Sequence, residues 1–418
     1  MTGTSQLMRV HRPAAVRALN RAASLLRKAG LFRLPLAEEA LLDAARRKAG
    51  GRDFEDGSFR EALRYLVDSL EREAELNFIG RMAAREDILQ LLVNRLHLER
   101  DRGLYPEIAA QTIVKPLFIT GLPRTGTTLL HSLLALDPGY RAPLTWEVMY
   151  PSPPTGEGER ERIARTENNF AWLNRLAPDF KKTHLAGAML PQECVAITSH
   201  AFMSDQFDTM YNVPAYRTWF EARDMRPAYD FHRRFLQHLQ YRDPALRWVL
   251  KAPAHMLALD ALLTVYPDAQ VVQTHREPLE VIASTASLTT ILRGTFSDFV
   301  DTALIGREMS EFWAETLETF ARSREKYDAR RFFDLDYLEF VKDPVGCIRR
   351  LYQYFGNELS VESEGRMREF LARNPKDKHG AHRYTLGEFG LDAQRESARF
   401  QRYRERYNIT TPQMLAAV

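Results

Sequence analysis

The chain contains 418 residues, of which 45% are hydrophobic and 27% are charged, and this composition is that of a folded globular protein rather than a disordered one. Its 58 Lys and Arg residues nearly balance 55 Asp and Glu residues, so we expect no nucleic-acid partner and only a local pocket for an anionic ligand. The two cysteines, Cys194 and Cys347, have no CxxC partner, which argues against a disulfide scaffold or a zinc site and favours a reducing, cytoplasmic compartment.

The N-terminal segment predicts a basic amphipathic helix, because no acidic residue precedes Glu38. One face carries apolar residues at helical spacing and the other carries cations: Leu19, Ala22, Ala23 and Leu26 against Arg17, Arg21 and Lys28. We favour a helix docked on its own protein, and the alternatives are contact with an anionic membrane surface or a transit peptide. No apolar run approaches the roughly 20 residues that span a bilayer. A homodimer is left open.

The middle of the chain changes from a helical pattern to a strand-and-helix pattern. Residues 36–102 carry apolar side chains three and four positions apart, which predicts helices. From Ile113 onward, four short β-branched or aromatic runs are each followed by a helical stretch: "IVKPLFIT", "RWVLK", "AQVVQTH" and "RFFDLDY". This alternation predicts an α/β fold with a P-loop-like parallel sheet flanked by helices.

We therefore divide the chain into three parts: an N-terminal helical extension over 1–105, an α/β domain over 106–395 and a C-terminal tail helix over 396–418. About 100 residues separate the first two strand runs, and this segment, at about 150–245, predicts a helical insertion over the active site. Aromatic residues are frequent in it. They predict either a core or an apolar acceptor pocket, and we favour the core: Phe170, Trp172, Phe180, Phe202, Phe207, Tyr211, Tyr216, Trp219 and Phe220.

The stretch "PLFITGLPRTGTTLLHSLLAL" carries a phosphate-loop pattern with one substitution. Strand, glycine-rich loop and helix follow one another, so backbone amides and the helix N-terminus would surround an anion. Gly121 and Gly126 are in register, but Thr127 stands where the usual loop has the lysine that reaches the phosphates of ATP or GTP. Arg124 can supply a charge instead, and its forked guanidinium suits a diphosphate or phosphosulfate.

This loop resembles that of the nucleotide-dependent sulfotransferases, which use 3′-phosphoadenosine 5′-phosphosulfate (PAPS), release the bisphosphate PAP and need no metal. The likeness is to the branch that includes tyrosylprotein sulfotransferases and many bacterial members. The segment "VVQTHREPLEVIASTASL" is similar to the family's second motif, a strand that ends in Arg with a Ser eight residues later. The resemblance implies 5′-phosphosulfate binding by Arg124, Thr125, Gly126, Thr127 and Thr128, and 3′-phosphate binding by Arg276 and Ser284.

The resemblance extends over residues 115–391 and implies further site residues. "VLKAPAH" places Lys251 beside the transferred group, and "FFDLDY" places Tyr337 near the adenine nucleotide. "KDKHGAHRYTLGEFGL" is similar to a terminal basic loop whose cations close over the cofactor, which implies roles for Lys378, His382 and Arg383.

In-line sulfuryl transfer to a hydroxyl needs a general base for the acceptor proton and cations for the leaving side. Arg124 and Lys251 suit the second task. Because Glu147 lies 23 residues beyond Arg124, close to the family's spacing, we predict that it is the base; the rival candidates are His184, His200, His255 and Glu193.

The acceptor region carries no match to peptide-binding members, so we expect a small-molecule or lipid alcohol: a lipid, sterol, phenol or carbohydrate. Two other functions remain as alternatives at this point. A phosphate-loop kinase of a small molecule would require magnesium and an acidic residue to hold it, for which Asp336 is a candidate. A non-catalytic nucleotide-binding protein would keep the anion sites without a base.

Overall fold

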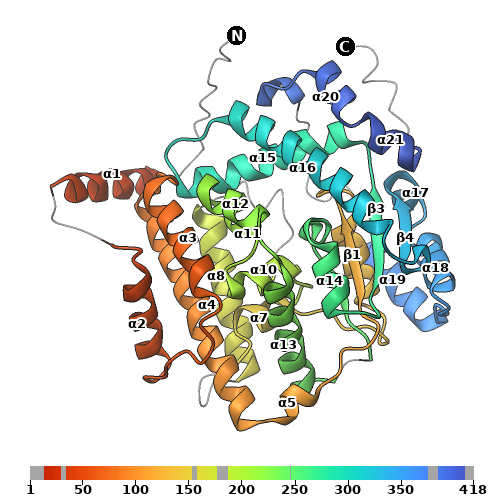
Figure 1. Cartoon of the computed structure of the whole chain (residues 1–418), viewed down its shortest axis with the longest axis horizontal. Coiled ribbons are helices and arrows are strands. Elements are labelled where there is room, and N and C mark those ends of the chain that lie inside the picture. Colours follow the sequence, from red (N-terminus) through yellow and green to blue (C-terminus); the bar gives the residue numbers. More distant parts are fainter. Residues whose placement is uncertain are drawn as a thin grey trace.

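The computed structural model describes residues 14–29, 34–152, 158–176, 187–244, 246–374 and 385–409. A four-stranded parallel sheet lies at one end of the molecule, and a large group of helices extends from it (Figure 1). The predicted α/β fold class, with helices on a parallel sheet, is confirmed. The strands are β1 (Leu117–Gly121), β2 (Val249–Lys251), β3 (Gln270–His275) and β4 (Phe332–Asp336).

The strand order is β2-β1-β3-β4, so the first strand pairs with the second on one side and with the third on the other. Every residue of β1 is buried, as expected for a parallel sheet covered on both faces. Because β1 is the strand at which the chain changes direction across the sheet, the crevice at its carboxyl end is the expected ligand position in an open α/β fold.

The two faces of the sheet bury different side chains of the same strands. On one face, Leu117 and Ile119 pack in a core with α6 (Thr127–Leu134) and α18 (Pro344–Tyr354). On the other face, Phe118 packs in a larger core with the remaining sheet-covering helices: α13 (Arg226–Arg242), α14 (Leu259–Val265), α15 (Pro278–Phe296) and α16 (Thr302–Arg324). This alternation along β1 fixes the register of the loop that follows it.

Shorter elements complete this part of the fold. Tyr403 of the last helix hydrogen-bonds to His275 at the end of β3, with 2.9 Å between its hydroxyl and Nδ1, so the C-terminal segment is anchored at the carboxyl edge of the sheet. The remaining helices here are α17 (Tyr337–Lys342), α19 (Val361–Arg373), α20 (Ala393–Arg399) and α21 (Gln401–Tyr407).

A second core joins the N-terminal helices to the segment between β1 and β2. Leu63 and Leu92 of the N-terminal part pack in one cluster with Phe207 and Tyr216. Figure 1 shows these helices side by side, away from β4. The helices of the N-terminal part are α2 (Glu38–Lys48), α3 (Arg60–Arg72), α4 (Phe78–Leu104) and α5 (Glu107–Ala110), and those between β1 and β2, besides α6 and α13, are α7 (Thr145–Met149), α8 (Glu159–Leu176), α10 (Cys194–Thr198), α11 (Gln206–Met210) and α12 (Pro214–Glu221). Of these, α7 and α10 contribute Val148, Cys194 and Ile197 to the core that contains Phe118.

Most aromatic residues of the insertion are therefore core residues. Phe202 stacks on Phe207, and Tyr216 packs between Phe207 and Phe220. Trp172 is instead 62% exposed, and Phe180 lies outside the described residues. The aromatic pattern thus marks the core shared by the insertion and the N-terminal helices.

The basic helix α1 (Ala14–Lys28) packs against α4. Asn20 and Ala23 are buried there, and the Asn20 side chain accepts a hydrogen bond from the Ile79 amide at 3.2 Å. Leu19, assigned to the apolar face, is 46% exposed. Contact of α1 with a membrane surface stays a prediction. Within the described ranges, no helix has the length and hydropathy to cross a bilayer.

Gly121 allows β1 to pack against β3 immediately before the loop. A Cβ atom at this position would lie 2.3 Å from Thr274 Oγ1 and 2.5 Å from Thr274 O, and the φ of Gly121 is +134°. We expect Gly121→Ala to lower the free energy of unfolding by about 3 kcal/mol, from overpacking and backbone strain together. Chemical denaturation measures the change. Gly356→Ala is the control, because Gly356 also has a positive φ but open space around it; equal losses in both variants would contradict the steric argument.

Candidate active site

The loop after β1 forms a concave backbone at the N-terminus of α6. Arg124 and Gly126 have φ values of 66° and 86°, in the left-handed region, and Gly126 is the N-cap of the helix. Gly126 has no side chain that could cap this helix end, so the first amide N–H groups of α6 are suited to bind an anion. A Cβ at Gly126 would lie 3.2 to 3.3 Å from the rings of Phe340 and Tyr337, which limits this position to a small residue.

The three threonines of the loop have different surroundings. The Thr125 hydroxyl is fully buried and donates to Leu122 O at 2.6 Å, so this side chain holds the loop in shape. Thr127 is also buried, whereas Thr128 is exposed. Only Thr128 therefore presents its side chain at the surface of the loop.

Lys251, the last residue of β2, brings a lysine to the loop, which has Thr127 at the usual lysine position. Its ammonium group donates to Thr128 Oγ1 at 3.3 Å and forms an ion pair with the carboxylate of Glu193, which immediately precedes α10. The lysine side chain is 3% exposed and the glutamate side chain 20% exposed. The loop, the neighbouring strand and the insertion thus meet at one polar cluster.

The structure also brings together three of the residues predicted to bind the nucleotide. The Arg276 guanidinium lies over the Tyr337 ring at 4.2 Å, and its Nη1 donates to the Arg124 carbonyl oxygen at 2.8 Å. Nε and Nη2 donate to Glu280 Oε2 at 3.0 and 2.8 Å. Ser284 lies one turn beyond Glu280 on α15. Arg276, which is predicted to bind the 3′-phosphate, therefore also contacts the loop that is predicted to bind the 5′-phosphosulfate.

Glu147 has a different environment from the one predicted for a base. Its Oε2 accepts the Leu144 amide at 2.8 Å, which caps α7, and its Oε1 accepts Arg141 Nη2 at 2.5 Å. Arg141 pairs with Trp248, just before β2. The segment that carries Glu147 runs parallel to β2 from Arg141 onward, and Leu144 pairs with Pro191, two residues before Glu193. The Glu147 carboxylate is thus in the same region as Lys251, but it is engaged by Leu144 and Arg141. Its role as the base stays a prediction.

The histidine candidates for the base are either buried or outside the described residues. His200 is buried, Nε2 lies 3.0 Å from Asn94 Nδ2, and burial lowers its pKa to about 4. His255 is buried beside the insertion, and burial holds its pKa well below the usual value. His184 and the predicted basic loop with Lys378, His382 and Arg383 lie outside the described residues. No group of three or more metal-binding side chains occurs in the part of the chain that the structure describes.

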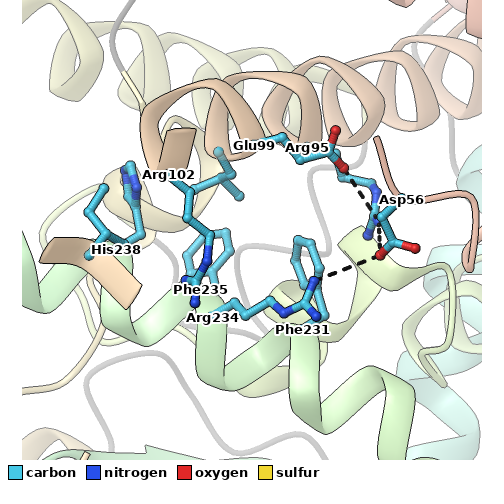
Figure 2. Close-up of a pocket in the computed structure, with 10 residues that line it drawn as sticks. Asp56, Arg95, Glu99, Arg102, Phe231, Arg234, Phe235 and His238 are labelled. Atoms are coloured by element: carbon cyan, nitrogen blue, oxygen red, sulfur yellow. Dashed lines mark hydrogen bonds and ion pairs between the residues drawn. The ribbon is translucent and has the colours of Figure 1, made fainter. Parts of the chain in front are cut away.

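A pocket on the other side of α13 is separate from this cluster (Figure 2). It lies between α4 and α13, and Asp56 forms ion pairs there with Arg95 at 3.3 Å and Arg234 at 3.9 Å. Arg95 lies 4.3 Å from the centre of the Phe59 ring and 4.6 Å from that of Phe231. Asp56 thus pairs with both Arg95 and Arg234, and Arg102 donates to Gln237 Oε1 at 3.2 Å, so we interpret this pocket as structural.

An anion-binding loop, a lysine from the next strand and an arginine after the third strand define an enzyme that transfers a group from an anionic nucleotide. A model of the sulfotransferase family matches residues 116–361, more than half of the chain. The chain therefore belongs to the sulfotransferase family and is a sulfotransferase enzyme. A kinase activity finds no support in this assignment.

Similar proteins come from mycobacteria. The sulfotransferase STF1 from Mycobacterium tuberculosis has a TM-score of 0.76 and 33% identity, covering 87% of this chain and 97% of that chain. STF9 from Mycobacterium avium has a TM-score of 0.79 and 28% identity, covering 91% and 98%. The omega-hydroxy-beta-dihydromenaquinone-9 sulfotransferase Stf3 of Mycobacterium bovis is 26% identical over 310 residues, 68% of this chain and 75% of that protein.

Proposed function

We propose that this protein transfers the sulfuryl group of PAPS to the hydroxyl group of an apolar alcohol, with Glu193 as the general base. The observation that carries the proposal is the contact of Lys251 with both Thr128 of the loop and the Glu193 carboxylate. The cation that would stabilise the leaving group, Lys251, is thus adjacent to the base that would take the acceptor proton, Glu193.

The described residues fit PAPS at two separate anion sites. Uncapped amides of α6 and Lys251 suit the 5′-phosphosulfate, and Arg276 with Tyr337 suits the 3′-phosphate and the nucleoside. PAPS would supply the sulfuryl group, whose bond to the acceptor oxygen forms as the bond to the bridging oxygen breaks and PAP leaves. Arg124, Ser284 and the basic residues near the C-terminus are proposed to add to the same two sites.

The ion pair also holds the Glu193 carboxylate and the Lys251 ammonium side by side, where the acceptor hydroxyl and the leaving group would meet. An acceptor hydroxyl that enters between the two groups would weaken their interaction and leave Lys251 to the leaving side. Glu193 would then take the acceptor proton, while Lys251 and the loop amides would stabilise the negative charge on the departing oxygens.

The acceptor class follows from a relative and from the walls of the site. Stf3, by its name, acts on an omega-hydroxylated menaquinone, which is a lipid alcohol. In this chain the residues after Glu193 and Lys251, Cys194 and Ala252, are buried in an apolar core. We therefore propose an alcohol on an apolar carbon skeleton and not a sugar.

The donor is tested by calorimetry with PAP and adenosine 5′-monophosphate, which differ by the 3′-phosphate. We expect Arg276→Ala to weaken PAP binding by about 10- to 100-fold, the scale of lost hydrogen bonds from a charged group, and to leave the monophosphate unaffected. Arg330→Ala is the control, because that side chain is 90% exposed. Equal weakening of both nucleotides would remove Arg276 from the 3′-phosphate site. Metal-independent transfer of labelled sulfate from PAPS to an alcohol tests the reaction itself.

A further inference from the structure

A small pocket lies beside the Lys251 and Glu193 cluster, on the side of the insertion. Cys194 and Ala252, the residues that follow the ion pair, contribute to its wall, and its volume is about 280 Å³, including the part that opens to solvent. Its other walls are largely apolar and include Val195, Met203, Phe220 and Met225. Only about 20 Å³ of this space can hold the centre of a water-sized group, so the pocket takes one small group at the end of a larger molecule.

Two polar atoms in this pocket are buried without a hydrogen-bond partner among the described residues: Asp205 Oδ1 and His255 Nε2. The His255 ring is held in place, because its Nδ1 lies 2.8 Å from the Tyr229 hydroxyl and its edge meets the Phe118 ring at 4.9 Å. With Nδ1 occupied, only Nε2 is left for a ligand. The residue is 3% exposed.

The other hydroxyl groups of the pocket already have partners. Thr198 and Ser204 both donate to the Val195 carbonyl oxygen, at 3.2 and 2.8 Å. Asp205 and His255 are therefore exceptions in a wall that is otherwise apolar or satisfied. An unpaired buried polar group destabilises the protein, and a ligand that supplies the missing hydrogen bond removes this cost.

The Asp205 carboxyl is close to the reacting groups. Burial raises its pKa to about 7, and the negative charges of Glu193 and Asp208 contribute to the increase. Near neutral pH this carboxyl can thus be protonated and donate a hydrogen bond, or be ionised and accept one.

We infer that this pocket selects an acceptor alcohol that carries a second oxygen function on its apolar skeleton, and that Asp205 and His255 bind this second oxygen. The inference rests on the proposed function, because the first hydroxyl must reach Glu193. The second oxygen enters the pocket and binds Asp205 and His255, and the carbon skeleton extends from the pocket toward Glu193. Asp205 and His255 are specificity residues and take no part in bond making.

The test uses two matched pairs of probes: cyclohexanol with trans-1,4-cyclohexanediol, and 1-hexanol with 1,6-hexanediol. The value of kcat/KM for labelled sulfate transfer from PAPS is measured for each, together with the thermal stabilisation of the PAP-bound protein by each probe. We expect the wild-type protein to prefer the diol of at least one pair by about tenfold or more, since a site that hydrogen-bonds an oxygen rejects the analogue without it.

Asp205→Leu and His255→Phe should each reduce this preference to near unity, in transfer and in thermal stabilisation. Asp230→Leu is the control, because that carboxylate is exposed and pairs with Arg233. The ratio of two probes does not depend on how much protein is folded, so a merely structural role would leave it unchanged. Equal use of diol and mono-alcohol by the wild type, or a preference that both variants keep, would overturn the inference. Absence of transfer to every probe, with weak PAP binding, would instead overturn the proposed function.

Discussion

Glu193→Gln should lower kcat by about 100- to 10,000-fold, the usual contribution of a general base, while the protein stays folded. The amide cannot accept the proton of the acceptor hydroxyl. The substitution also removes the negative partner of Lys251, so we expect PAP to bind as tightly as before or more tightly. Single-turnover transfer of labelled sulfate measures the chemical step, and calorimetry with PAP measures the nucleotide site separately.

Glu147→Gln is the matched comparison, since it makes the same chemical change in the carboxylate that the sequence spacing favoured. The glutamine oxygen can still accept the Leu144 amide, but the ion pair with Arg141 is lost. We expect a lower free energy of unfolding, because the ion pair is buried and Arg141 would lose this partner. We expect a kcat within about twofold of wild type, because the Glu147 carboxylate caps its own helix and is not the proposed base. The reverse pattern, with Glu147→Gln inactive and Glu193→Gln active, would return the base to Glu147 and reject Glu193.

The parts of the site that lie within one continuous segment could be predicted from the sequence. Strand, loop and helix are consecutive around Gly121 and Gly126, so the pattern itself fixes the backbone concavity. The proximity of Arg276 to Arg124 also followed, because parallel strands β1 and β3 end at the same edge.

The polar cluster around Lys251 could not be predicted in this way. Lys251 comes from β2 and Glu193 from the insertion, and their pairing depends on how that insertion folds back over the loop. Glu147 has a local signal that resembles a functional one: a glutamate three residues after the N-cap position caps its own helix. Distance along the chain from Arg124 identified this segment, but it carried no information about which way the carboxylate points.

For the aromatic residues of the insertion, the sequence predicts burial but does not predict which element each side chain packs against. Their number in one segment indicated a large apolar surface, and the structure divides that surface between the shared core and the pocket. Phe202, Phe207, Tyr216 and Phe220 pack with the N-terminal helices, and Phe220 also lines the pocket beside His255. Hydrophobicity predicts that such side chains are covered, but the covering element is set by tertiary contacts between distant segments.

Arg95→Ala should lower the free energy of unfolding by about 3 to 5 kcal/mol, the scale for removing one partner from a buried ion pair. Arg95 is 1% exposed, and its Nη1 donates to the His200 carbonyl oxygen at 3.0 Å. Burial lowers its pKa to about 10, so the side chain remains charged at neutral pH. Its loss would remove the donor to this carbonyl and leave a cavity between Phe59 and Phe231. Figure 2 shows Arg95 and Phe231 at this pocket.

Arg234→Ala provides the control for this prediction, because Arg234 faces the same Asp56 carboxylate from the solvent side. Its side chain is 53% exposed and the ion-pair distance is 3.9 Å, so the expected loss is below about 1 kcal/mol. Urea denaturation followed by far-ultraviolet circular dichroism measures both variants under the same conditions. Comparable losses would mean that the charge on Asp56 dominates. A large loss for Arg95 alone means that the N-terminal helices, through one buried guanidinium, stabilise the insertion that carries Glu193.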